Sequence, residues 1–128
     1  MLAPLTTLPQ NNELFCLTQN VYYEARAEPK AGKLAVALVT LNRTNDSRFP
    51  PTICQVVYQK RQFSWTTSYN KGGINMFQWK LSQEAALEAY MDRDILGRFK
   101  ATHFHNTTIN PRWNLHRVTK IGNHIFYM

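Results

Sequence analysis

Two glutamates at helical spacing are the first residues whose types could do chemistry. Glu24 and Glu28 lie four residues apart in the stretch NVYYEARAEPKAG, and Pro29 follows directly. A carboxylic acid that stays protonated near neutral pH is a general acid, and it suits protonation of a glycosidic oxygen. Whether either glutamate can do this depends on how the surrounding helix places it. From position alone, a border glutamate that caps a loop is the competing interpretation.

Apolar residues at helical spacing precede these glutamates, namely Leu14, Leu17, Val21 and Ala25. They predict a helix from about residue 12 to 27, because Pro29 disfavours its continuation. On a helical wheel, Glu24 falls about 60° from the centre of the apolar face. Partial burial and the negative end of the helix dipole therefore predict a raised pKa for Glu24, with Arg26 and Lys30 opposing it. We expect the proline to draw Glu28 away, to hold the turn or Arg26.

The rest of the pattern predicts an α+β domain, mainly helical with a small antiparallel β element at its C-terminal end. Further helices are expected over residues 31–43, which would be central and buried, 52–59 and 79–94. Residues 61–75 are interpreted as strand or extended loop, 101–106 and 121–128 as strands, and 110–120 as the segment joining those two strands.

Composition indicates one domain spanning residues 1–128, with a short extension over residues 1–10. Hydrophobic residues make up 44% of the chain, and the net charge is +7. This charge indicates an anionic partner, although solubility alone is an alternative. We expect no secretory signal and no transmembrane segment. Cys16 and Cys54 lie among apolar residues and are interpreted as buried free thiols, since a disulfide needs a proximity that spacing does not show.

Five ordered blocks between about Val21 and Tyr127 resemble the cell wall hydrolase family of SleB, the spore-cortex-lytic enzyme. These blocks are YYEARAEPKAGKLAVALVTLNR, RFPPTICQVVYQ, QFSW, ATHFHN and IGNHIFY. The resemblance implies a peptidoglycan-cleaving enzyme with a lysozyme-like or lytic-transglycosylase-like domain. It implies that Glu24 is the catalytic glutamate and that the cut falls between N-acetylmuramic acid and N-acetylglucosamine. We expect a monomeric, stand-alone endolysin that is made in the cytoplasm, phage-encoded and released to the wall by a holin.

A mechanism with one carboxylate fits this chain best. Glu24 would act as acid and then as base in lytic transglycosylation, with Glu28 at most an auxiliary residue. Hydrolysis by a muramidase with the same glutamate is the alternative. A glycan groove needs aromatic platforms with amide and hydroxyl partners, although large aromatics also pack in cores. The candidate substrate-binding residues are Tyr23, Gln62, Phe63, Ser64, Trp65, His103, His105, Asn106, Trp113 and His124.

Two other classes compete with this interpretation. His103 and His105 would share one face of a strand, and His124 approaching from a paired strand would complete a three-histidine zinc site, as in an amidase. Such a site would leave the YYEAR block without a purpose, so we expect no metal and no cofactor. A nucleic-acid-binding protein is the other class. The basic residues are scattered, so we expect no nucleic acid, and anionic wall or outer-membrane polymers account for the charge equally well.

Overall fold

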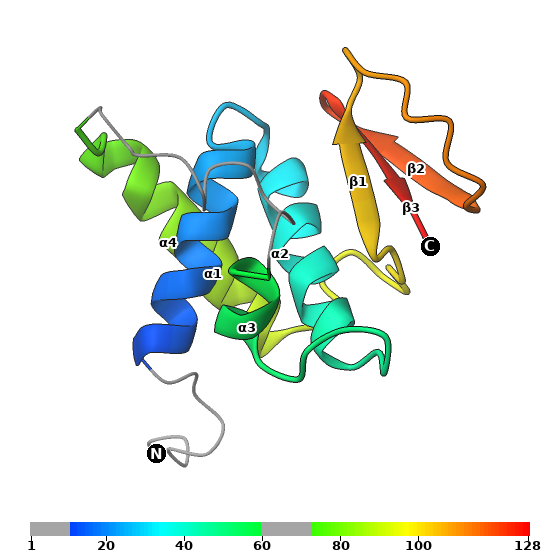
Figure 1. The fold of residues 1–128 in the computed structure, drawn as a ribbon. Coiled ribbons are helices and arrows are strands. Elements are labelled where there is room, and N and C mark those ends of the chain that lie inside the picture. Colours follow the sequence, from blue (N-terminus) through cyan, green and yellow to red (C-terminus); the bar gives the residue numbers. More distant parts are fainter. Residues whose placement is uncertain (1–10, 60–72) are drawn as a thin grey trace.

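A helical body is followed along the chain by a small sheet (Figure 1). The computed structural model describes residues 11–59 and 73–128. Within this part of the chain, the helices are α1 (Asn11–Ala25), α2 (Lys30–Thr44), α3 (Ile53–Val57) and α4 (Met76–Met91). The strands are β1 (His103–Asn106), β2 (Arg117–Ile121) and β3 (His124–Tyr127). The predicted α+β class, mainly helical with a small antiparallel sheet, is confirmed.

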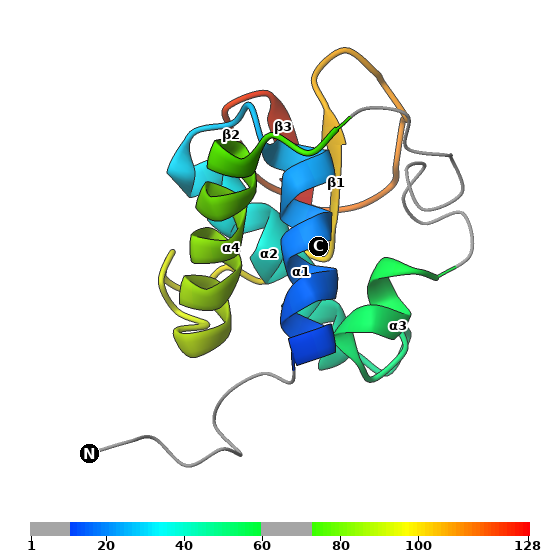
Figure 2. The same ribbon diagram turned by 90° about the vertical axis from the view of Figure 1, so that its left-hand side faces the viewer.

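Helix α2 is the centre of the molecule. Every residue from Gly32 to Leu41 is buried. The helix lies between α1 and the sheet (Figure 1), and α4 packs against both α1 and α2 (Figure 2). Its sequence is apolar on nearly every side, so it is stable only where other elements pack around it. Full burial of one Leu or Val side chain contributes about 1.5–3 kcal/mol to the free energy of folding. The predicted central, buried helix is confirmed.

Pro29 separates the first two helices as predicted. Helix α1 ends at Ala25, and Pro29 directly precedes α2 with φ −61°. Its carbonyl accepts the backbone N–H of Lys33 at 3.1 Å, which is the first turn of the new helix. A proline is tolerated there because its missing N–H is not needed at a helix start. By contrast, α4 begins three residues before the predicted start, because the Asn75 side chain caps it.

The sheet differs from the prediction in its second strand. The three strands are antiparallel in the order β1-β3-β2. The prediction that residues 110–120 only join two strands is wrong, since β2 covers Arg117–Ile121. The predicted strand over 121–128 is interrupted, because Gly122 with φ +57° and Asn123 form a two-residue turn into β3. A glycine at the first position of such a turn supplies the positive φ that the hairpin requires.

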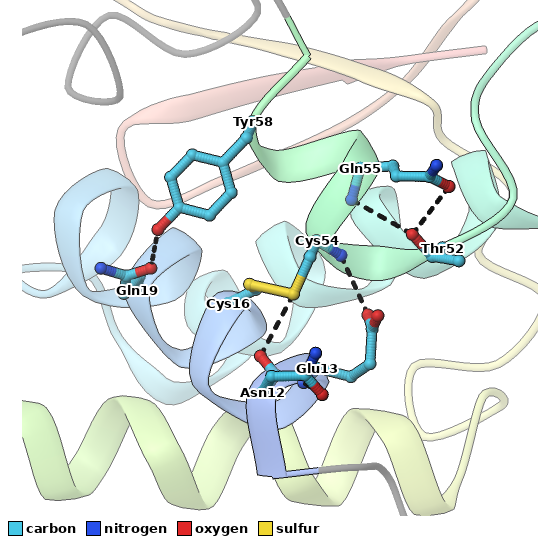
Figure 3. The surroundings of a disulfide bond; sticks show 8 residues. All are labelled: Asn12, Glu13, Cys16, Gln19, Thr52, Cys54, Gln55 and Tyr58. Atoms are coloured by element: carbon cyan, nitrogen blue, oxygen red, sulfur yellow. Dashed lines mark hydrogen bonds between the residues drawn. A yellow bond between two sulfur atoms is a disulfide. The ribbon is translucent and has the colours of Figure 1, made fainter.

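The two cysteines form a disulfide, so the prediction of free thiols is wrong. Cys16 of α1 and Cys54 of α3 are bonded, with 5.2 Å between their Cα atoms. Figure 3 shows how α3 lies across α1 at this point, where the Glu13 carboxylate also accepts the Cys54 backbone N–H at 2.9 Å. The Tyr58 hydroxyl donates to the side-chain amide oxygen of Gln19 one turn further along α1. These contacts tie α3 to α1.

Candidate active site

Glu24 lies in the last turn of α1, one residue before the helix ends. Its side chain is half-buried, whereas Asn20 and Val21, one turn earlier, are fully buried. Residues three and four apart on a helix are neighbours on its surface, so Glu24 continues a buried face. The prediction that Glu24 lies at the border of the core near a helix C-terminus is confirmed. Its raised pKa stays a prediction.

The end of α1 that carries this glutamate is held from two sides. Toward α2, the Thr40 hydroxyl donates to Asn20 Oδ1 at 2.7 Å. Toward α4, the ring of Tyr22 packs on Trp79 with centroids 5.5 Å apart, and its hydroxyl accepts the Asn75 backbone N–H at 3.0 Å. Well-packed, hydrogen-bonded surroundings fix a functional side chain better than a loop does. Glu24 therefore stands on a rigid support.

The Glu28 side chain is buried and hydrogen-bonded to the turn between β2 and β3. It is 8% exposed, and its Oε1 accepts the backbone N–H of Asn123 at 2.7 Å. Its Oε2 accepts the Asn123 side-chain amide at 3.3 Å. The expectation that Glu28 leaves the helix is confirmed, since α1 ends at Ala25. The expected partners, the local turn or Arg26, are wrong, because Glu28 binds the β2–β3 turn, 95 residues away. Arg26 lies instead over the ring of Tyr22, 4.9 Å from its centroid.

The three candidate histidines do not converge. In the β1–β3 register, His124 stands opposite Asn106, and His105 stands opposite Ile125. Because neighbouring residues of a strand point to opposite faces, His103 and His105 lie on one face and His124 on the other. The ring of His124 contacts Phe104 and Phe126 instead. The approach of His124 that the zinc alternative requires is not found, and these three imidazoles do not fit a shared zinc ion.

On the outer face of the sheet, His105 has a protein partner at each ring nitrogen. Its Nδ1 lies 2.8 Å from the Asn106 carbonyl, and its Nε2 lies 2.8 Å from the Tyr127 hydroxyl. A carbonyl only accepts, so Nδ1 carries a proton, and in the neutral ring Nε2 accepts from the tyrosine. The rings of His103 and His105 both contact Trp113. This face is an aromatic cluster with Trp113, 39% exposed, at its surface.

Burial sets the protonation of two histidines. Desolvation lowers the pKa of His103, and the nearby Arg43 and Arg48 charges lower it further, with Asp46 opposing. Desolvation also lowers the pKa of His124, although the Glu28 carboxylate opposes this. Burial penalises the charged imidazolium, so both rings favour the neutral form at neutral pH. His124 is 4% exposed and His105 is 6% exposed, so neither ring has surface to offer a glycan, contrary to the prediction.

A groove beside Tyr23 was missed by the sequence analysis. It has a cavity volume of about 400 Å³. Its lining residues are Phe15, Gln19, Tyr23, Ile74, Met76 and Trp79. Phe15, Gln19 and Tyr23 recur every four residues along the exposed side of α1, and this spacing was the available signal. The groove offers aromatic and apolar surface with one amide, next in sequence to Glu24.

The remaining candidate residues divide into two groups. Asn106 is exposed, and its Oδ1 accepts the Thr108 backbone N–H at 2.9 Å, so it stabilises the loop after β1. The predicted glycan contacts at Gln62, Phe63, Ser64 and Trp65 lie outside the described residues. The structure thus gathers Tyr23 and Glu24 at the end of α1, and His103, His105 and Trp113 on the sheet.

Solved structures with this fold define its class. The structure matches the catalytic domain of the germination-specific lytic transglycosylase SleB from Bacillus anthracis, with a TM-score of 0.76 and 27% identity. The match covers 98% of this chain and 100% of that one. The catalytic domain of the Bacillus cereus SleB protein matches with a TM-score of 0.77 and 28% identity, over 98% of this chain and 99% of that one. The fold is that of a SleB catalytic domain.

The chain belongs to the Cell Wall Hydrolase family, whose model matches residues 27–127. That range begins after Glu24, so the family assignment stands independently of this residue. Among curated relatives, the spore cortex-lytic enzyme of Halalkalibacterium halodurans is 34% identical over 119 residues. This alignment covers 91% of the chain and 34% of the relative. Across the spore cortex-lytic enzymes that it matches, the chain spans 34–45% of their length.

Proposed function

We propose that this chain cleaves the glycan strands of peptidoglycan by lytic transglycosylation, between N-acetylmuramic acid and N-acetylglucosamine. The observation that carries the proposal is the likeness, over 98% of the chain, to the catalytic domain of a germination-specific lytic transglycosylase. The spore cortex-lytic relatives support the same class of substrate. The half-buried position of Glu24 at a helix end supports a role in proton transfer.

In the first step, Glu24 acts as general acid. Its carboxyl proton moves to the glycosidic oxygen, and the bond between that oxygen and C1 of the muramic acid breaks. The positive charge that develops at C1 is stabilised by the acetamido group of the substrate itself. Partial burial and the negative, C-terminal end of the α1 dipole both favour a protonated Glu24 side chain before the reaction. This is the form that a general acid needs.

In the second step, the same side chain acts as base. The Glu24 carboxylate accepts the proton of the muramic C6 hydroxyl while that oxygen bonds to C1. An anhydro ring closes, no water is consumed, and Glu24 returns to its protonated form. The C6 hydroxyl belongs to the same sugar ring as C1, so its attack is intramolecular and has the advantage of proximity.

A single catalytic carboxylate is consistent with the surroundings of Glu28. Classical retaining and inverting glycosidases need two carboxylates, one on each side of the scissile bond. Here the second acid of the motif is buried, and both of its oxygens accept hydrogen bonds from Asn123. A mechanism in which the substrate supplies the nucleophile needs no further acid from the protein.

Hydrolysis is the second candidate. The family description names a hydrolase, and this favours a reaction in which water replaces the C6 hydroxyl as nucleophile. Glu24 would still protonate the leaving oxygen and would then deprotonate the water. The product would carry a reducing muramic acid end instead of an anhydro end.

We further propose that the groove beside Tyr23 receives part of the glycan strand. Phe15 and Trp79 are in contact, with ring centroids 5.6 Å apart, and Gln19 contributes a polar side chain. The apolar faces of sugars stack on such rings, while amides bind their hydroxyls. The groove runs along α1 and ends at Tyr23, in the helical turn that also carries Glu24, so a strand in this groove would extend toward the reacting group.

We infer that the protein acts at the cell wall, outside the cytoplasm. The Cys16–Cys54 disulfide supports this, because such bonds persist in oxidising compartments. The +7 charge supports attraction to anionic wall or outer-membrane polymers. No helix among residues 11–59 and 73–128 has the length and apolar character that crossing a membrane requires. The phage origin, the holin-mediated release and the monomeric state stay predictions.

The products of purified peptidoglycan test the proposal. Released muropeptides are analysed by mass spectrometry, with and without a chelator. Muropeptides with anhydro-muramic ends, formed equally with chelator, are the expected result. Reducing muramic ends would replace the proposal by hydrolysis. Free stem peptides that disappear with chelator would contradict glycan cleavage and indicate a metal-dependent amidase.

A further inference from the structure

A buried carboxylate joins the helical body to the sheet. Glu28 belongs to the segment between α1 and α2, and it bonds the turn between β2 and β3 at two atoms of Asn123. His124 follows as the first residue of β3, with its Nδ1 3.4 Å from Glu28 Oε1. The side chains of Glu28 and His124 are 7% and 5% exposed. Hydrogen bonds to a buried carboxylate are worth more than surface contacts, because water does not compete for them.

Two glycines make room for this carboxylate. A Cβ atom at Gly122, on the hairpin, would lie 2.6 Å from Glu28 Oε1. A Cβ atom at Gly32, on α2, would lie 3.0 Å from Glu28 Cβ. Contacts below 3.0 Å do not occur without displacement. Glu28 is therefore enclosed between α2 and the hairpin, and any side chain at position 122 would push its carboxylate out.

Side chains from α2 and from the sheet enclose Glu28. Lys33 of α2 is buried, and its Nζ donates to the Glu28 backbone carbonyl. Burial lowers the pKa of this lysine, and the charge of Glu28 opposes that shift. His124 faces the carboxylate from the sheet. Both carboxylate oxygens of Glu28 accept hydrogen bonds from Asn123 inside the protein, so neither oxygen faces a substrate.

We propose that Glu28 is a positioning residue, which clamps the β2–β3 turn to the α1–α2 segment and so fixes the sheet relative to Glu24. Glu28 and Glu24 are four residues apart, so the clamp acts close to the reacting group. The proposal rests on the proposed role of Glu24. Misplacement of a site by about 1 Å can cost about a hundredfold in rate, so a loose hairpin slows the reaction without unfolding the protein.

Four single variants and one double variant of the whole chain test this proposal. Glu28→Ala removes the clamp, and Glu28→Gln keeps an acceptor for the Asn123 N–H. Gly122→Ala displaces the carboxylate without changing Glu28. Gly97→Ala is its matched control, since Gly97 also has a positive φ, +74°, but no atom within 4 Å of its added Cβ. The kcat on soluble glycan fragments is measured where each variant is fully folded, and exchange of the Asn123 amide proton is followed by NMR.

We expect Glu28→Ala and Gly122→Ala to lower kcat about 10–100-fold and to speed exchange of the Asn123 amide. The kcat of Glu28→Gln stays within about threefold of the wild-type value, because a neutral hydrogen-bond acceptor for Asn123 remains. The kcat of Gly97→Ala equals that of the wild type. The kcat of the double variant Glu28→Ala with Gly122→Ala is no lower than that of Glu28→Ala alone.

Wild-type kcat in fully folded Glu28→Ala or Gly122→Ala would overturn the proposal. So would a Glu28→Gln variant as inactive as Glu28→Ala with its pH profile changed, because Glu28 would then transfer protons. If Glu28→Ala does not fold, Gly122→Ala and Glu28→Gln decide the matter. Amide exchange does not depend on catalysis, so failure of the clamp is distinguished from failure of the role of Glu24.

Discussion

Thr40 donates a 2.7 Å hydrogen bond to the side-chain oxygen of Asn20 across the α1–α2 interface, and both residues are fully buried. Asn20 lies one turn before Glu24 on α1. A polar pair in a packed core specifies one alignment of two helices, because any shift leaves a buried acceptor without its donor. This bond therefore fixes the rotation and height of the helix end that presents the glutamate.

Replacement of Thr40 by valine keeps the shape of the side chain and removes its hydroxyl. The Asn20 oxygen then loses its donor inside the core, so we expect the free energy of unfolding to fall by about 1–3 kcal/mol. Urea denaturation measures this change. Thr40→Ser, which keeps the hydroxyl, is the control for loss of the bond. A Thr40→Val value within about 0.5 kcal/mol of the wild type would show that the bond contributes nothing.

Removal of the Cys16–Cys54 disulfide is expected to destabilise the protein. The bond joins residues 38 apart in the sequence, so it restricts the unfolded chain considerably. Loops of this size predict a loss of about 2–4 kcal/mol on reduction. Denaturation with and without reductant measures the loss, and the double variant Cys16→Ser with Cys54→Ser should no longer respond to reductant. Identical curves for the oxidised and reduced wild type would argue against the bond.

His124 predicts how stability depends on pH. Burial lowers its pKa below the ordinary 6.5, so the folded protein keeps the ring neutral while the unfolded chain protonates it. The unfolded state binds more protons in this window, so the free energy of unfolding falls as the pH drops below about 6.5. His103 acts in the same direction.

Denaturation of the wild type and of His124→Gln between pH 5 and pH 8 isolates this contribution. We expect a shallower pH dependence in the variant. A slope unchanged by the substitution would show that His124 does not contribute, and a wild type that becomes more stable toward pH 5 would reverse the sign.

Local signals in the sequence predicted much of the helical body. The apolar spacing from Leu14 to Ala25 and the proline at position 29 fixed α1 and its end to within two residues. The same wheel placed Glu24 at the border of the core, since this depends only on helix geometry and on which face is apolar. The continuous apolar run likewise predicted that α2 is central.

One missed local signal and several long-range contacts account for the failures. The Gly122–Asn123 turn was readable as a hairpin signal, and missing it merged the end of β2 with β3. Without the turn, the register of β3 against β1 could not be assigned. A shift of one residue in register exchanges the two faces of a strand, so the face on which His124 lies could not be assigned either. The disulfide and the partner of Glu28 depend on contacts between segments 38 and 95 residues apart, which no local pattern reveals.

Substitution of Glu24 by glutamine tests the central claim most directly. Glutamine keeps the size of the side chain and removes the proton that the mechanism transfers. Release of soluble fragments from purified peptidoglycan is measured for wild type and variant, with circular dichroism to verify that both are folded. The account predicts a rate lower by about 10²–10⁴-fold or more in a fully folded variant. Near-wild-type release by folded Glu24→Gln would contradict it.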